Sequence, residues 1–258
     1  MKRCLKRCSK TCSLVSCVLW LAVAVMASWA GMSPARADIY VIESTAPGVK
    51  VGPLADSAEI SIPPGGHIRA VMPSGKTQLI KGPYSGPVAD LVKGQKPNPG
   101  VLAWIKSILQ TGGATEATPG ATRSIGKESA RPRAGFSWVS VPVHADSTVC
   151  VQKGARLQLV RAPSQRVERV TVVDVTGAER GDAQWAAGSD AAAWPDAVAL
   201  RADGSYFLLV PDRPRRQVTL RMLERLPAEE DVLTELEARG CRLQFEAWVK
   251  EKMAVAGR

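Results

Sequence analysis

Histidine is scarce in this sequence: the 258 residues contain only two, His67 and His144. Any histidine-based chemistry therefore depends on one of these side chains. His67 follows Gly66 at the start of an expected strand, which favours a surface turn residue. His144 stands two residues before Asp146, a spacing that arises often by chance. Because no nucleophile motif accompanies either histidine, a hydrolase using His144 is the least favoured of three functional hypotheses.

Clusters of histidine, cysteine and carboxylate residues at metal-ligand spacing are also missing from the sequence, so no metal or cofactor is expected. Residues 73–77, PSGKT, end like a phosphate-binding loop, but Ala70 stands where that motif begins with glycine. The surrounding pattern predicts strand, turn, strand, whereas a phosphate loop joins a strand to a helix. The sequence therefore predicts a protein without enzymatic activity.

Acidic residues are missing before Asp38, although the whole chain has 24. Six basic residues precede Asp38, and without them 28 basic and 24 acidic residues remain, a net charge of +4 instead of +10. The excess positive charge therefore belongs to the leader, and nucleic acid is not an expected partner.

The leader itself has a cationic head, an apolar run over residues 14–30 and the small-residue site Ala35-Arg36-Ala37. This order predicts a signal peptide over residues 1–37, cleaved after Ala37, and a periplasmic protein. A retained membrane anchor with the same orientation is the alternative, because the apolar run is long for a signal peptide. Contact with a membrane is expected only in that second case.

Cysteine is confined to two positions outside the leader, Cys150 and Cys241. In an oxidising compartment, two remaining cysteines are most simply a disulfide. Two unconnected buried thiols are the alternative interpretation.

Turn residues are abundant between Gly48 and Gly86, where they separate short apolar runs. The pattern predicts strands near residues 39–41, 49–51, 60–62, 68–72 and 77–80. Asn98 and Pro99 then suit the start of an amphipathic helix whose apolar face includes residues 101, 102, 105, 108 and 109. Residues 38–110 are therefore expected to form a small β domain with a short helix.

This segment resembles the periplasmic FecR-type domain of bacterial signalling proteins. The resemblance covers about forty residues and lies in the order of turns: Gly65-Gly66, a strand, Pro73-Ser74-Gly75, a strand, then Gly82-Pro83. It implies a pair of strands, joined by a tight turn, whose surface is read by partner proteins. Only thirteen residues precede the apolar run, so direct control of a sigma factor, which needs the anti-sigma-factor segment of a full FecR-type sensor, is not expected.

Residues 111–135 are rich in glycine, alanine, threonine and proline, which predicts a flexible linker. Beyond it, residues 136–226 are expected to form a β-sandwich, and residues 227–258 a helical segment that begins after Pro227 and is interrupted at Gly240. The expected strands cover residues 136–143, 148–151, 157–161, 169–175, 197–201, 205–210 and 216–223. The fold class is thus mainly β.

The leading hypothesis is a non-enzymatic periplasmic protein whose FecR-like domain binds an envelope protein or senses the state of the envelope. Its candidate partner surface consists of Arg69, Lys76, Gln78 and Lys81. A carbohydrate-binding module is the alternative, with polysaccharide held by exposed tryptophans and the arginines of residues 213–216. Filling of the core by the tryptophans and shielding of an edge strand by the arginines are the simpler interpretations.

Overall fold

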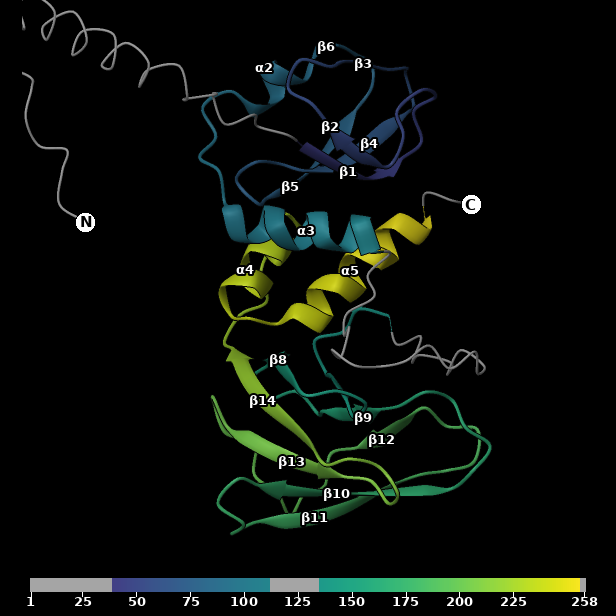
Figure 1. Ribbon diagram of the computed structural model, residues 1–258, viewed down its shortest axis with the longest axis vertical. Coiled ribbons are helices and arrows are strands. Elements are labelled where there is room, and N and C mark those ends of the chain that lie inside the picture. Colours follow the sequence, from purple (N-terminus) through teal and green to yellow (C-terminus); the bar gives the residue numbers. More distant parts are fainter. Residues whose placement is uncertain (1–38, 112–134, 256–258) are drawn as a thin grey trace, which may run out of the picture. The chain divides into compact units, whose positions relative to one another are not determined.

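The computed structural model describes residues 39–111 and 135–255 (Figure 1). The predicted signal peptide and almost all of the predicted linker lie outside these ranges. Within them the chain is mainly β, with several sheets and with short helices after the last strand, as the sequence predicts. None of the described helices is long and apolar enough to cross a membrane.

The turn-rich segment forms a four-stranded antiparallel sheet in the order β2-β1-β4-β5. The turn between β4 and β5 contains Gly75, whose φ of +85° favours glycine. A Cβ atom at Gly75 would also lie 2.9 Å from Cγ2 of Val101, so packing as well as backbone geometry requires glycine here. The strands are β1 (Ile39–Ser44), β2 (Gly52–Leu54), β4 (His67–Val71) and β5 (Thr77–Lys81).

A second, two-stranded sheet completes this part of the chain, with β3 (Glu59–Ile62) antiparallel to β6 (Tyr84–Pro87). The short helix α2 (Val88–Val92) follows directly. One face of each sheet and α2 enclose a core of aliphatic side chains, including Ile62, Ile68 and Val88.

Helix α3 (Pro99–Thr111) begins as the sequence predicts. The side-chain oxygen of Asn98 accepts a hydrogen bond from the backbone N–H of Val101, 3.2 Å away, and Pro99 is the first helical residue. Val101, Ile105 and Ile108 are buried on one face of the helix.

The second part contains a five-stranded sheet, in the order β11-β10-β13-β14-β8, and a three-stranded sheet, in the order β12-β9-β7. Pairing is antiparallel except between β14 and β8 and between β7 and β9. The two sheets share one core, which contains Trp185, Trp194 and Tyr206. The strands are β7 (Ser140–Pro142), β8 (Ser147–Gln152), β9 (Gln158–Val160), β10 (Glu168–Asp174), β11 (Arg180–Trp185), β12 (Ala191–Ala193), β13 (Ser205–Leu209) and β14 (Arg216–Leu223).

In this part, one predicted strand does not form, another is shorter than predicted, and two strands were not predicted. Residues 197–201 form no strand, because side chains hold their backbone in a loop: the Tyr206 hydroxyl donates to the carbonyl of Ala199, and the Trp194 indole N–H donates to that of Val198. Strands β11 and β12 were not predicted, since neither is rich in β-branched residues. Of residues 136–143, only the last part is a strand, and the first part contributes packed aromatic rings instead.

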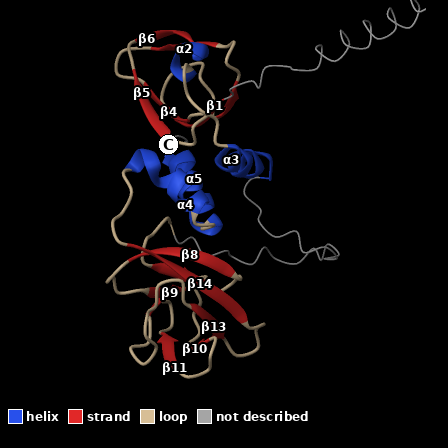
Figure 2. Ribbon diagram, turned by 90° about the vertical axis from the view of Figure 1, so that its left-hand side faces the viewer, coloured by secondary structure: helices blue, strands red, loops and turns tan. Residues whose placement is uncertain are grey.

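The helical tail begins with the 3₁₀ turn η1 (Glu229–Asp231), followed by α4 (Val232–Ala238) and α5 (Arg242–Val255). Together with α3, these helices form a core that receives Tyr40 and Ile42 from β1 and Leu223 from β14 (Figure 2). Helix α5 contacts both β1 and β8.

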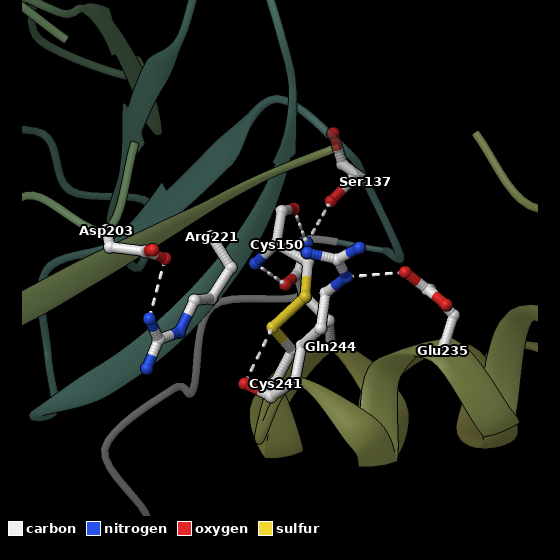
Figure 3. The surroundings of a disulfide bond; sticks show 8 residues. Ser137, Cys150, Asp203, Arg221, Glu235, Cys241 and Gln244 are labelled. Carbon is white, nitrogen blue, oxygen red and sulfur yellow. Dashed lines mark hydrogen bonds and ion pairs between the residues drawn. A yellow bond between two sulfur atoms is a disulfide. The ribbon is translucent and has the colours of Figure 1, made fainter. Parts of the chain in front are cut away.

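The predicted disulfide joins Cys150 of β8 to Cys241 at the start of α5, with 5.8 Å between the two Cα atoms (Figure 3). Both cysteines are fully buried. The bond therefore fixes the beginning of α5 to the edge of the five-stranded sheet.

Candidate interaction surface

Strand β5 is the outer strand of the four-stranded sheet and pairs only with β4 among the described strands. The direction of its backbone groups follows from the ends of the β4–β5 ladder. The N–H of Met72 donates to the carbonyl of Lys76, and the N–H of Gly82 donates to that of Gly66. Because hydrogen-bonded pairs alternate along an antiparallel ladder, Gln78 and Ile80 bond to β4. Thr77, Leu79 and Lys81 thus direct their N–H and C=O groups away from it.

Two of the four predicted surface residues are exposed on this strand. Gln78 and Lys81, the second and the last residue of β5, are both exposed. Between them lies Leu79, which is 40% exposed and was not among the candidate residues. A strand over these residues is expected from the sequence, with Thr77, Leu79 and Lys81 on one face and Gln78 and Ile80 on the other. The sequence does not indicate that this strand lies at the edge of its sheet.

The other two predicted residues, Arg69 and Lys76, form ion pairs with acidic residues of the same chain. Arg69 of β4 lies between two carboxylates, with Nε 2.8 Å from Oε2 of Glu43 and Nη1 3.1 Å from Oε1 of Glu229. Lys76 forms an ion pair with Asp231, 2.9 Å away. Both cations therefore hold η1 against the β4–β5 hairpin.

Charge compensation in this network lowers the pKa of both glutamates. Burial opposes ionisation of Glu43, yet hydrogen bonds from Arg69 and His67 leave its pKa below the ordinary value. A hydrogen bond from Lys252 of α5 lowers the pKa of Glu229. Burial raises that pKa by a smaller amount, and the charge of Arg69 lowers it further. The network thus connects β1, β4, η1 and α5.

His67 belongs to this network and is not the simple turn residue that the sequence predicts. It is the first residue of β4, and its Nε2 lies 3.1 Å from Oε1 of Glu43. The other histidine, His144, is exposed in the turn between β7 and β8. Near it, Oδ1 of Asp146 accepts a hydrogen bond from the backbone N–H of Gln217, 2.7 Å away, so this carboxylate holds the start of β14.

The other three outer strands of the two larger sheets, β8, β2 and β11, are covered or interrupted. At β8, the side chain of Gln244 accepts from the N–H of Cys150 over 2.6 Å and donates to its carbonyl over 2.7 Å (Figure 3). At β2, Pro53 lacks an N–H group and leaves an incomplete edge. At β11, a Cβ atom on Gly181 would lie 2.7 Å from Pro195, so the chain after β12 lies close against that strand. At β5, the beginning of the strand contacts η1 and Thr77 is buried, but Leu79 and Lys81 are exposed, and among the described residues no side chain caps their backbone groups.

The arginine run does not shield an edge strand, which corrects that interpretation: β14 lies between β13 and β8. Arg213 contacts both carboxylate oxygens of Glu168 at 2.9 Å. Arg215 lies over the ring of Phe207, 4.2 Å from its centre. These arginines thus pack on neighbouring strands.

The tryptophans within the described residues fill cores, as the simpler interpretation predicts. Trp185, Trp194 and Trp248 are buried, and Trp104 and Trp138 are partly buried against the core formed by the helices. A groove of about 430 Å³ borders Trp194, Asp182 and Asp196. The indole of Trp194 is 7% exposed and forms no open ring platform in that groove. Within the described residues, no group of three or more histidine, cysteine or acidic side chains is placed to hold a metal.

Comparison with known proteins found no matching family model, no similar curated protein and no similar solved structure. The relation to FecR-type domains therefore stays a prediction from the order of turns. The geometry of β5 and its surroundings is the basis for a functional proposal.

Proposed function

We propose that this chain is a non-enzymatic periplasmic protein that binds a protein partner, or senses the envelope through one, with the free edge of β5. In this account residues 38–110 are a FecR-like domain, residues 136–226 a β-sandwich, and the disulfide-linked residues 227–258 a helical support. The observation that carries the proposal is an edge strand whose outward backbone groups have no partner among the described residues.

Binding would occur by strand addition, in which an extended segment of the partner continues the sheet. The N–H and C=O groups of Thr77, Leu79 and Lys81 supply the hydrogen bonds. Exposed side chains supply selectivity: Leu79 favours an apolar residue opposite it, and Lys81 favours an acidic one.

The helical tail prepares this edge for binding. Arg69 and Lys76 attach the β4–β5 hairpin to Glu229 and Asp231, and Lys252 attaches Glu229 to α5. A strand that is held in place before binding loses less conformational entropy when the partner arrives. The intramolecular role of Arg69 and Lys76 thus supports recognition by their neighbours on β5.

The carbohydrate-binding alternative is not advanced, because the tryptophans that it requires pack into cores. A catalytic role for His144 likewise has no supporting observation.

Crosslinking in living cells tests the proposal. A photoreactive residue replaces Gln78, and the matched control replaces Gln217, an exposed glutamine of the interior strand β14. We expect a reproducible protein partner from position 78 alone. We also expect Leu79→Pro to abolish capture, because it removes an outward N–H group that a partner strand would need. The variant should still fold, because β4 does not use this N–H group and proline is tolerated at such edge positions.

Folding of the Leu79→Pro variant is checked by its urea unfolding midpoint. Capture of the same proteins from positions 78 and 217, or undiminished capture by a folded Leu79→Pro variant, would contradict the proposal.

A further inference from the structure

We propose that the partner of β5 is β5 of a second copy of this chain, paired antiparallel about a two-fold axis at Leu79. This inference depends on the proposed function of the β5 edge and names its occupant.

The outward-facing residues of β5 are symmetric about their centre. With Leu79 opposite its own copy, Thr77 of each chain lies opposite Lys81 of the other. All three residues direct their N–H and C=O groups toward the open edge. Each outward N–H group of one copy would therefore meet an outward C=O group of the other. An isologous interface of this kind closes after two copies and leaves no free edge on either β5.

The side chains match this register. Leu79, 40% exposed in the single chain, would contact an identical leucine at the axis, and apolar pairs directly opposite one another stabilise a sheet. In a strand, Thr77, Leu79 and Lys81 share one face, and the contact of Lys76 with Asp231 places η1 beside the beginning of β5.

Charge is complementary in the same arrangement. Lys81 of one copy would lie opposite Thr77 of the other, which is buried at the end of β5 that contacts η1, and its ammonium group would approach Glu230 and Asp231. The hydrogen bond and charge of Asp231 raise the pKa of Lys76, and exposed Glu230 adds a smaller effect of the same sign. The acidic turn that is attached to one end of β5 therefore attracts the basic residue at the opposite end of a second β5.

Single cysteines test the register directly. In a hydrogen-bonded antiparallel pair, the Cα atoms are about 5.5 Å apart. That separation suits a disulfide, which spans roughly 4.4–6.8 Å. Leu79→Cys should thus form a disulfide with its own copy, whereas two Lys81→Cys residues would be ~13 Å apart.

The experiment uses the full chain with the four leader cysteines, Cys4, Cys8, Cys12 and Cys17, replaced by serine. Leu79→Cys, Lys81→Cys and Val167→Cys are compared after mild oxidation, Val167 being an exposed position on the other part of the chain. We expect the covalent dimer to be the main species for Leu79→Cys and a trace for the other two. In sedimentation, a concentration-dependent dimer of the parent chain should be lost in Leu79→Pro.

Equal crosslinking at all three positions, or a dominant dimer from Lys81→Cys, would overturn the register. Absence of a Leu79→Cys dimer, together with capture of a different protein from position 78, would overturn self-pairing and leave the proposed function standing. Absence of both would overturn the two proposals together.

Discussion

Gln244 of α5 forms hydrogen bonds with both backbone polar groups of Cys150 on the edge strand β8. Its amide occupies the place of a neighbouring strand, and its Nε2 also donates to the carbonyl of Ser137 over 2.8 Å. The five-stranded sheet therefore ends at a side chain of the same molecule. Among the described residues no side chain caps Leu79 on β5 in this way, and this contrast with β8 favours β5 as an edge available to a partner.

Replacing Gln244 by alanine should lower the free energy of unfolding by about 2–3 kcal/mol, because the buried N–H and C=O of Cys150 lose their partners. Urea unfolding with the disulfide intact measures the effect. Gln217→Ala, on an exposed side chain, is the matched control and should change stability by less than about 0.5 kcal/mol. Equal effects of the two variants would show that the Gln244 contacts contribute nothing.

Reduction of the Cys150–Cys241 disulfide should lower the free energy of unfolding by about 2–4 kcal/mol, since it releases a constraint across 91 residues of the unfolded chain. Unfolding with and without reductant measures the change. A Cys150→Ala/Cys241→Ala variant should be insensitive to reductant. Two titratable thiols at these positions in the oxidised, unfolded protein would contradict the bond.

Acid should weaken the ion-pair network through Glu43. Its pKa in the folded protein is lower than the ordinary 4.5, so its contribution to stability is complete above that pH and is lost as the pH falls through the lower, folded pKa. Glu43→Gln should destabilise the protein at neutral pH by about 1–3 kcal/mol. The variant should also lose less stability than the parent between about pH 5 and pH 3.

Unfolding curves across this pH range measure the effect of Glu43, with Glu59→Gln as a control on an exposed glutamate of β3. A pH dependence of Glu43→Gln that equals that of the parent would show that Glu43 does not couple folding to protonation.

Local chemistry made much of the fold predictable. Asn98 and Pro99 correctly predict the start of α3, and the two cysteines outside the leader predict their disulfide. Alternation along residues 216–223 predicts β14. Strands without such a pattern were missed: β12 is three alanines, and β11 has a single buried residue at its end. Their pairing depends on distant strands, which a local pattern does not report.

The candidate surface was predictable only in part, for the same reason. Gln78 and Lys81 were selected as polar residues of an expected hairpin, and both are exposed. Arg69 and Lys76 form ion pairs with Glu229 and Asp231, which lie more than 150 residues away in the sequence, so no spacing rule connects them. Exposure of Leu79 follows from the strand order, which the sequence alone does not determine.

Residue-resolved amide hydrogen exchange of β5 in the full chain tests the central claim most directly. In dilute protein, the account predicts slow exchange at Gln78 and Ile80, whose N–H groups bond to β4, and fast exchange at Leu79 and Lys81, whose N–H groups face the open edge. At concentrations where the chain associates, Leu79 and Lys81 should become protected while Gln78 and Ile80 change little. Protection of all four amides in the dilute monomer would contradict the claim that β5 is a free binding edge. Fast exchange at Leu79 and Lys81 in the associated state would contradict the pairing of β5 with its own copy.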